Sequence, residues 1–217
     1  MTADEVVKYL QSYLDGKLPA GSEADQQGQG AAIVSCMDGR LNAFLRPFRF
    51  VIRTAGAVAE PVEGSLAVAV ESTGVTLLAT HGDCLAYKAA IQYLAASFAG
   101  QISPGNVVAN LNRPDTKAVL TAINAQRPLN ALPDPNDQRA VAEIGVSYAR
   151  QWTASNRTDK PRVGLFIDLK SVLATQPQAW VVSYDGFAGP HLVNFLGIHG
   201  MNSQAISRYV LREPLRH

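Results

Sequence analysis

The sequence predicts an α/β fold in which a central, mostly parallel β-sheet is flanked by helices. Short apolar runs without charged residues recur along the chain, as is typical of parallel strands that are covered on both faces. Longer segments with apolar residues at helical spacing lie between these runs. Because expected strands and helices alternate in this way, an α/β sheet is favoured over an all-helical or all-β architecture.

The elements are expected in the following order. An amphipathic helix covers residues 3–15, which carry apolar side chains at helical spacing: Val6, Val7, Leu10 and Leu14. A polar loop follows over residues 16–30. The five expected strands cover residues 31–35, 48–52, 75–79, 163–167 and 179–184. The expected helices between and after them cover residues 65–72, 84–98, 117–124, 138–153 and 202–211.

Length and composition limit the class of protein. The 217 residues are expected to form one domain, residues 1–217, with a helix and loop over 1–30 and a carboxyl-terminal extension over 186–217. Hydrophobic residues make up 47% and charged residues 17%, as in ordinary soluble proteins. The net charge is +1 and there is no basic stripe with interleaved aromatic residues, so no nucleic-acid partner is expected.

No membrane partner is expected either. No apolar run approaches the ~20 residues that cross a bilayer. The acidic amino terminus does not resemble a secretory signal. We therefore expect a cytoplasmic protein, a compartment in which a disulfide between the two cysteines is disfavoured.

The two cysteines of the chain each follow an expected strand. Cys36 lies in the segment SCMDGR, and Cys84 lies in the segment THGDC, which also contains His81. Because the carboxyl ends of parallel strands meet at one edge of a sheet, these side chains are expected to converge, together with Arg53 at the end of the second strand. Two thiolates and an imidazole are three of the four ligands of a tetrahedral zinc ion, and they suit zinc better than magnesium or calcium.

Either Asp38 or a water molecule is expected to be the fourth ligand. Arg40 can pair with Asp38 through its planar guanidinium group. A paired Asp38 would stay ionised near neutral pH and away from the metal, so that the open position holds a water whose pKa a catalytic zinc lowers to about 7. Asp38 and Arg40 are therefore the candidate catalytic residues.

Other interpretations fit the same residues less well. A buried cysteine after a strand is often only a small hydrophobic residue. A closed structural zinc site commonly uses C-x-x-C pairs, and so does a redox dithiol, but this chain has none. A cysteine phosphatase needs Arg six residues after its cysteine, where this chain has Asn42. Asp83 is expected to be solvated or to cap its loop. The remaining histidines are expected to be surface or interface groups: His191, His199 and His217.

In these residues the chain resembles the β-class carbonic anhydrases, over roughly residues 31–98. The family carries Cys-x-Asp-x-Arg after its first strand, an Arg-x-Ala-Gly turn, a helix that begins with Ser-Leu, and His-x-x-Cys after its third strand. The matching residues here are Cys36, Asp38 and Arg40; Arg53, Ala55 and Gly56; Ser65 and Leu66; and His81 and Cys84.

The resemblance implies a β-carbonic anhydrase-like fold with Zn²⁺ on Cys36, His81 and Cys84. It implies that Asp38 binds the zinc in a closed, inactive state and pairs with Arg40 in an open, active one. The implied activity is the reversible hydration of CO2 to bicarbonate and a proton by zinc-bound hydroxide. A homodimer or higher homo-oligomer is implied as well, with the amino-terminal helix packed across the partner chain.

The same scaffold also serves carbonyl sulfide and carbon disulfide hydrolases, and a non-catalytic zinc-binding homologue is a third reading. This chain has Leu85 where the family usually has Gly, and Thr54 where it usually has Asn. Four apolar residues near the motifs are expected to belong to the core first and to a dry substrate pocket second: Phe44, Phe48, Val58 and Leu85.

Overall fold

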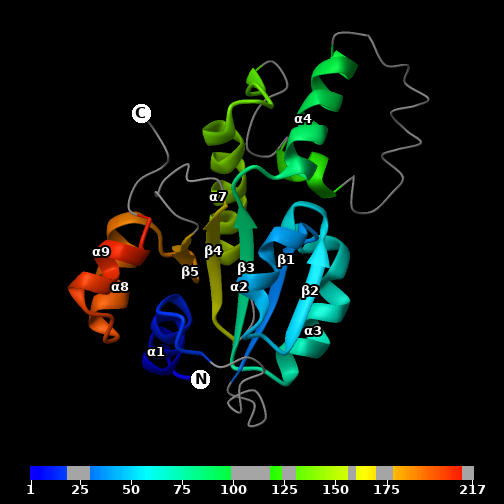
Figure 1. Ribbon diagram of the computed structural model, residues 1–217. Helices are drawn as coiled ribbons and strands as arrows, with labels where there is room; N and C mark the ends of the chain where they lie inside the picture. Colours follow the sequence, from blue (N-terminus) through cyan, green and yellow to red (C-terminus); the bar gives the residue numbers. More distant parts are fainter. Residues whose placement is uncertain (19–29, 99–117, 124–130, 156–159, 170–177, 212–217) are drawn as a thin grey trace.

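The computed structural model describes residues 1–18, 30–98, 118–123, 131–155, 160–169 and 178–211. Its centre is a five-stranded sheet with the strand order β2-β1-β3-β4-β5 (Figure 1). The strands are β1 (Ala31–Cys36), β2 (Phe50–Thr54), β3 (Val75–His81), β4 (Arg162–Asp168) and β5 (Gln178–Tyr184). Strands β1 to β4 run parallel, and β5 runs antiparallel to β4. The predicted mostly parallel α/β sheet is confirmed.

Helices flank this sheet on both faces. The α-helices that lie fully within the described residues are α1 (Ala3–Leu14), α2 (Asn42–Leu45), α3 (Glu63–Glu71), α4 (Leu85–Phe98), α7 (Gln138–Ala154), α8 (Gly189–Ile198) and α9 (Ser203–Tyr209). In Figure 1, α4 projects beyond the carboxyl ends of the strands rather than lying on a face of the sheet. In the view of Figure 1, α2 lies in front of the sheet, whereas α3 and α7 lie behind it. The helix expected over 117–124 falls only partly within the described residues, of which 118–123 are helical.

The burial of the strands explains their uncharged sequences. Every residue of β1 and β3, the two strands that end at the candidate ligands, is buried. Tight packing between β4, β5 and α7 depends on Gly164, because a Cβ atom there would lie 2.4 Å from the Ser183 Oγ and 3.2 Å from the Ala149 Cβ. The sheet therefore forms a rigid base for the loops at its carboxyl edge.

The amino-terminal helix α1 is covered by its own chain. Thr2 and Glu5 form a reciprocal capping box at its start, which fixes where the helix begins. Its apolar face carries Val6, Val7 and Leu10, all of which are buried within the single chain. The resemblance implied that this helix packs across a partner chain, but here the apolar face of α1 is already buried against its own chain.

The carboxyl-terminal segment contains a helix that we did not expect, α8. A proline in its first turn suits a helix start, but glycines at Gly189 and Gly197 weaken the sequence signal. Beyond α9, Val210 forms a parallel bridge with Val181 of β5, and the Leu211 N–H donates to the Val181 carbonyl at 3.0 Å. The extension therefore packs along the edge of the sheet.

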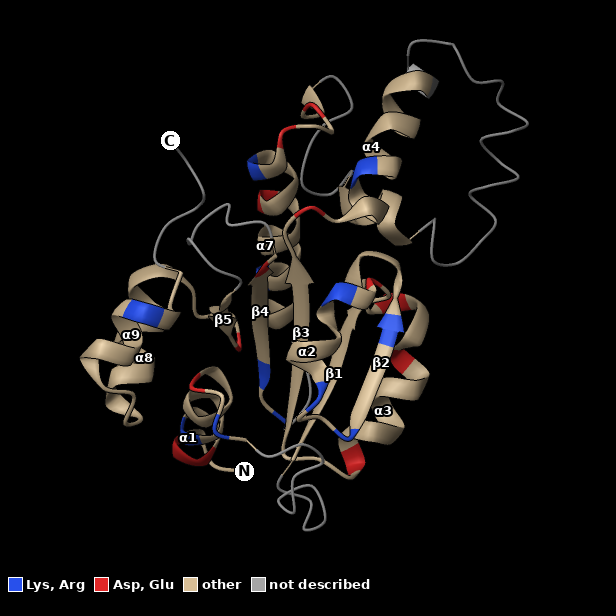
Figure 2. Cartoon of the chain, viewed as in Figure 1, with Lys and Arg blue, Asp and Glu red and all other residues tan. Residues whose placement is uncertain are grey.

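The charged residues are spread over many elements. Figure 2 shows Lys and Arg positions on several helices and strands rather than along one of them. Among the residues that the structure describes, no helix combines the length and the apolar character that a membrane span requires.

Candidate metal centre

Two adjacent strands bring the three predicted ligands together. Cys36 is the last residue of β1 and His81 the last residue of β3, and these strands pair in parallel register. Cys84 follows on the turn that leads into α4. One potential ligand atom from each of the three residues lies within 4.8 Å of the other two, and all three residues are buried. The predicted convergence of Cys36, His81 and Cys84 is thus present in the fold.

The spacing of the sulfur atoms fits a zinc ion. The two Sγ atoms, of Cys36 and Cys84, lie 3.9 Å apart. With zinc–sulfur bonds of about 2.3 Å and tetrahedral angles, two thiolate ligands stand about 3.8 Å apart. The sulfurs are also too far apart for a disulfide, and both cysteines are free. The donor set and its spacing therefore suit a tetrahedral zinc site.

The imidazole of His81 is oriented as a ligand would be. Its Nδ1 atom lies 2.7 Å from the Gly82 carbonyl oxygen. Because a carbonyl oxygen can only accept, Nδ1 carries the proton, and the lone pair of the neutral ring is on Nε2. That Nε2 atom is buried and has no hydrogen-bond partner. A metal ion would satisfy it, and a backbone carbonyl on the opposite ring nitrogen is the usual way in which a ligating histidine is fixed.

The two thiols perturb each other. The hydrogen bond with Cys84 lowers the pKa of the Cys36 thiol against the opposing effect of burial, and His81 lowers it further. The same hydrogen bond and burial raise the pKa of Cys84. One thiol of the pair therefore ionises readily, whereas the other keeps its proton until a cation replaces it.

Asp38 is turned toward Arg40. Its carboxylate accepts from the Arg40 backbone N–H at 3.0 Å, which starts the turn η2 (Gly39–Leu41). The Arg40 guanidinium also donates to it, with Nη2 2.5 Å from Oδ2. These bonds lower the pKa of Asp38 to about 2, so it is ionised at neutral pH. Asp38 does not belong to the group of three mutually close ligand atoms. In this structure the Asp38 carboxylate is therefore paired with Arg40 rather than placed among the three potential ligand atoms.

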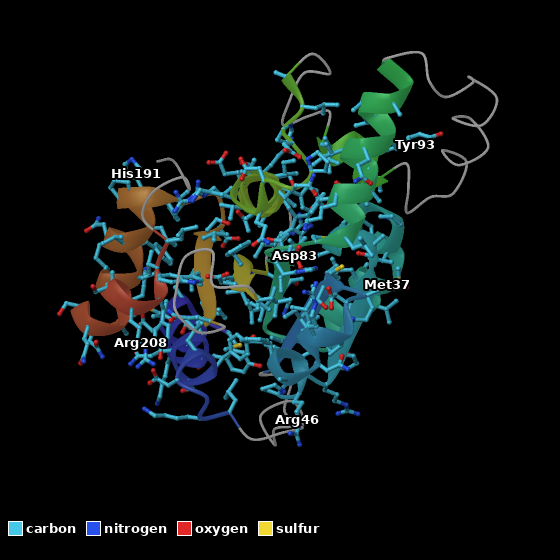
Figure 3. The ribbon with its side chains drawn as sticks, turned by 45° about the horizontal axis from the view of Figure 1, so that its top comes forward. Met37, Arg46, Asp83, Tyr93, His191 and Arg208 are labelled. Atoms are coloured by element: carbon cyan, nitrogen blue, oxygen red, sulfur yellow. The ribbon has the colours of Figure 1, made fainter. Side chains whose placement is uncertain are left out.

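The position of Asp83 corrects our expectation. We expected this residue to be solvated or to cap its loop, but its side chain is only 9% exposed and is paired with two cations. The Arg40 Nη1 donates to its Oδ2 at 3.0 Å, and the Lys88 Nζ donates to its Oδ1. Figure 3 labels Asp83 near the middle of the view, among the side chains between the elements. No signal in the sequence pointed to this pairing, because the spare donors of a half-exposed arginine can equally be satisfied by water.

Arg53 reaches the same edge of the sheet from β2, as expected. Its Nη2 donates to the Asp38 backbone carbonyl at 2.8 Å, and its Nη1 donates to the Asn42 side chain at 3.0 Å. The Met37 N–H adds a bond of 3.0 Å to the Thr54 carbonyl. Arg53 therefore holds the backbone of the loop that carries Asp38 rather than facing the sulfurs.

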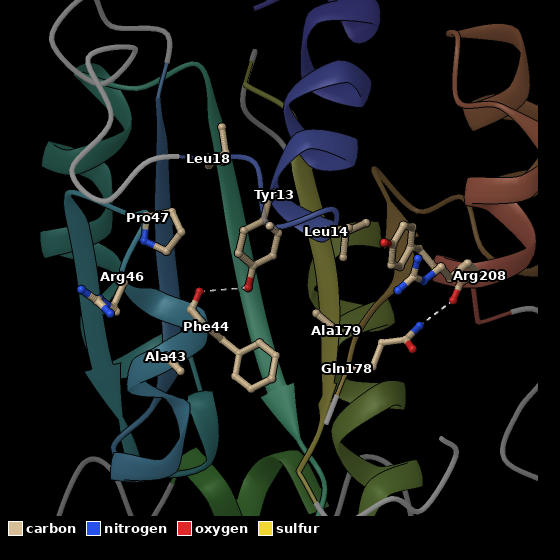
Figure 4. A pocket seen from close by; sticks show the side chains of 12 residues that line it. Tyr13, Leu14, Leu18, Ala43, Phe44, Arg46, Pro47, Gln178, Ala179 and Arg208 are labelled. Atoms are coloured by element: carbon tan, nitrogen blue, oxygen red, sulfur yellow. Dashed lines mark hydrogen bonds between the residues drawn. The ribbon is translucent and has the colours of Figure 1, made fainter. Parts of the chain in front are cut away.

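The four apolar residues near the motifs have different positions. Phe48 and Val58 are buried in the core, as expected first. Leu85 is 73% exposed, because it begins α4 on the solvent side, so the expectation of a core or pocket position was wrong for it. Phe44 is half-buried and lines a pocket of about 520 Å³ between α1, α2, β5 and α9 (Figure 4). None of the predicted site residues lines that pocket.

The two other histidines within the described residues belong to the carboxyl-terminal segment and are not in the group of close ligand atoms. His191 is exposed on α8. The Nδ1 atom of His199 lies 2.6 Å from the Asp4 carboxylate, and its ring packs against Phe195. His199 thus links α8 to α1, in keeping with the expected surface role. His217 lies outside the described residues.

Comparisons with solved structures return carbonic anhydrases. The chain is similar to a carbonic anhydrase from Glaciozyma antarctica, with 18% identity, 79% of this chain and 91% of that chain covered, and a TM-score of 0.39. It is also similar to a tetrameric β-carbonic anhydrase from Sordaria macrospora, with 13% identity, 74% of this chain and 83% of that chain covered, and a TM-score of 0.38. A carbonic anhydrase from Streptococcus mutans is similar with 22% identity, 77% of this chain and 93% of that chain covered, and a TM-score of 0.38.

These proteins are of the class that the sequence motifs resemble. At such identities and TM-scores the likeness does not assign an activity to this chain. No protein-family model matches the sequence, and neither does any curated protein.

Proposed function

We propose that the chain is a zinc-dependent carbonic anhydrase, which hydrates CO2 reversibly to bicarbonate and a proton. The observation that carries this proposal is the buried trio of Cys36, His81 and Cys84, with sulfurs 3.9 Å apart and an unpartnered Nε2 atom on His81. Bound zinc would act there as a Lewis acid that lowers the pKa of a water ligand to about 7.

In this proposal, Asp38 accepts a hydrogen bond that orients the metal-bound water. Because the Arg40 guanidinium keeps the pKa of Asp38 at about 2, its carboxylate is available as a hydrogen-bond acceptor throughout the neutral range. An acceptor next to the fourth metal position would orient a water molecule for attack on the carbon of CO2. The same pairing occupies the carboxylate and so keeps it from taking that position itself.

Gly56 offers a place for the substrate near the ligands. Its φ angle is +67°, a conformation that glycine adopts without strain. A Cβ at this position would lie 3.4 Å from the Tyr87 ring and from Val119, an ordinary van der Waals contact, so the positive φ angle rather than a lack of space favours glycine here. We propose that backbone donors of this turn orient the bound substrate or product.

Stopped-flow CO2 hydration by the zinc-loaded protein, from about pH 7 to pH 9, tests the proposal, because the water ligand of a catalytic zinc ionises near pH 7. Wild-type turnover is expected to rise with pH. Asp38→Ala is expected to keep its zinc and to lose most turnover. Asp15→Ala, which removes the carboxylate of the residue that follows α1, serves as the matched control and should retain activity.

Zinc-loaded protein without turnover at any pH would contradict the proposal. Hydrogen sulfide release from carbonyl sulfide or carbon disulfide would then identify a hydrolase. A protein that turns over neither of these substrates nor CO2 would be a non-catalytic homologue. A fully active Asp38→Ala variant would refute the role of Asp38. We also propose that the smallest active unit is a homodimer, and analytical ultracentrifugation tests whether the chain forms one. The cytoplasmic location stays a prediction.

A further inference from the structure

A chain of four charged side chains runs from the metal centre into α4. Arg40 is at its middle, with Nη2 2.5 Å from Asp38 and Nη1 3.0 Å from Asp83. The Arg40 Nη2 also donates to the Asp83 backbone carbonyl at 3.3 Å. Lys88, on the first turns of α4, donates to the second oxygen of Asp83. The two acids and the two bases alternate, so the charges of the chain compensate one another.

Asp83 is the most firmly held member of this chain. The Arg40 side chain is 44% exposed, and an exposed arginine with a single acid partner keeps much of its rotational freedom. The Asp83 side chain is 9% exposed and has a cation on each oxygen. Desolvated, charge-assisted bonds of this kind are stronger than surface ion pairs. The Arg40 Nε also donates to both Asp38 oxygens, at 3.0 and 3.1 Å, so Arg40 and Asp38 form one unit and Asp83 is the acid that anchors this unit on the ligand turn.

The backbone ties Asp83 to the ligands. The residue lies between His81 and Cys84 and has a φ angle of +58°, a left-handed conformation that Asp and Asn tolerate better than most residues. The neighbouring Gly82 N–H donates to the Ile167 carbonyl at 3.0 Å, which anchors the turn on β4. Whatever holds the ligand turn in place thus also holds the Asp83 carboxylate.

We propose that Asp83, steadied by Lys88, is a positioning residue that fixes Arg40 where it keeps Asp38 away from the fourth metal position. Without the Asp83 carboxylate, the 3.3 Å bond from the Arg40 Nη2 to the Asp83 backbone carbonyl is the remaining tie between Arg40 and the ligand turn, so Arg40 and Asp38 can shift and Asp38 becomes free to ligate the metal. The ratio of open to closed sites would then fall. This inference rests on the proposed zinc site.

Cobalt(II) in place of zinc makes the open fraction measurable apart from turnover. A thiocyanate ion can join a tetrahedral cobalt centre only where the fourth position is open, and its binding changes the visible absorption bands. Wild-type protein, Asp83→Gly, Asp83→Asn and Lys88→Met would each be loaded with cobalt(II) chloride and titrated with sodium thiocyanate. Glycine and asparagine both accept a positive φ angle, so neither Asp83 variant strains the turn.

For Asp83→Gly we expect thiocyanate binding to be weaker by about tenfold or more, the usual scale for losing a charge-assisted bond. Asp83→Asn keeps a neutral acceptor for Arg40 and should show a smaller loss, and Lys88→Met should as well. Asp15→Asn is the matched control, because Asp15 also pairs with a lysine, Lys17, but just after the end of α1. It should titrate like the wild type.

Equal thiocyanate affinity in Asp83→Gly and wild type, at full cobalt content, would overturn the inference. Loss of cobalt from both Asp83 variants would also overturn it, because the residue would then build the ligand turn rather than orient Arg40. A different result would contradict the proposed function. In that result the cobalt form of the wild type binds thiocyanate, but the zinc form hydrates no CO2. In that case the expected shifts in the Asp83 variants would still support the positioning role.

Discussion

The sulfur atoms of Cys36 and Cys84 lie 3.9 Å apart although 48 positions separate the two residues in the sequence. Their approach is a consequence of the parallel pairing of β1 and β3, since Cys36 is the last residue of β1 and Cys84 follows the carboxyl end of β3 by three residues. His81, also at the end of β3, completes the group. The proposed zinc site therefore depends on the register of two fully buried strands.

Replacing a predicted ligand should remove the metal. We expect Cys36→Ser and His81→Ala to retain no stoichiometric zinc, because each leaves only two strong donors. Zinc per chain, measured by atomic emission after gel filtration, checks this. Met37→Leu is the control, since Met37 adjoins Cys36 but is 58% exposed, and it should keep its zinc. A His81→Ala variant with full zinc content would contradict the ligand assignment.

Gly164→Ala should destabilise the fold. The added methyl group would lie 2.4 Å from the Ser183 Oγ and 3.1 Å from Val182, so strands and helix must shift. Overpacking of this kind costs about 1–3 kcal/mol in the free energy of unfolding. Urea denaturation measures the change. Gly64→Ala on α3, where a Cβ meets nothing within 4 Å, should leave stability unchanged or raise it. Equal effects of the two substitutions would contradict the packing argument.

Tyr87 and Tyr148 should respond differently to the loss of their hydroxyl groups. The Tyr87 hydroxyl is buried without a hydrogen-bond partner, so Tyr87→Phe should leave the free energy of unfolding unchanged or raise it by up to about 1 kcal/mol. The Tyr148 hydroxyl donates to Glu60 at 2.7 Å and accepts from the Ala59 N–H at 2.8 Å.

Tyr148→Phe should therefore lower the free energy of unfolding by about 1–2 kcal/mol, because a buried N–H loses its acceptor. Chemical denaturation of the two variants and the wild type gives both values. If Tyr87→Phe is destabilised as much as Tyr148→Phe, the Tyr87 hydroxyl has a partner, such as an ordered water, that makes it part of a network.

The bond between Tyr209 and Asp15 should stabilise the fold only in a window of pH. The Tyr209 hydroxyl donates to the Asp15 carboxylate at 2.9 Å. The pKa of Asp15 is lowered by Lys17 and then by Tyr209, so its contribution exists above about pH 4 and disappears as the pH falls through the lower folded pKa. Burial and then Asp15 raise the pKa of Tyr209, so its contribution exists below about pH 10 and disappears as the pH rises through the higher folded pKa.

Thermal unfolding of the wild type and Tyr209→Phe from about pH 3 to pH 11 tests this window. The difference in melting temperature should be largest between the two limits and should shrink at both ends. Lys17→Met should change the acid limit alone, because Lys17 acts on Asp15. A difference that is constant over the whole range would show that only packing is lost.

The sequence was sufficient for the features that depend on local pattern. The uncharged runs around β1 and β3 predicted both strands, and the residues directly after them predicted the ligands. The role of Asp83 could not be predicted in this way, because it depends on where a second loop places Arg40. Helix α8 was missed for a similar reason. Its glycines weaken the local signal, and the helix is held by burial of Leu192 and Leu196 against the rest of the chain.

The two margins of the sheet are not equivalent. At β5, Val210 and Leu211 cover the outer strand through their contacts with Val181. At the opposite margin, β2 pairs only with β1 among the described residues. A strand from another chain can therefore extend the sheet most readily beside β2, the strand that contains Arg53. The open margin of the sheet and the 2.8 Å bond that holds the backbone of the Asp38 loop therefore belong to the same strand, and a chain that paired with β2 would lie beside Arg53.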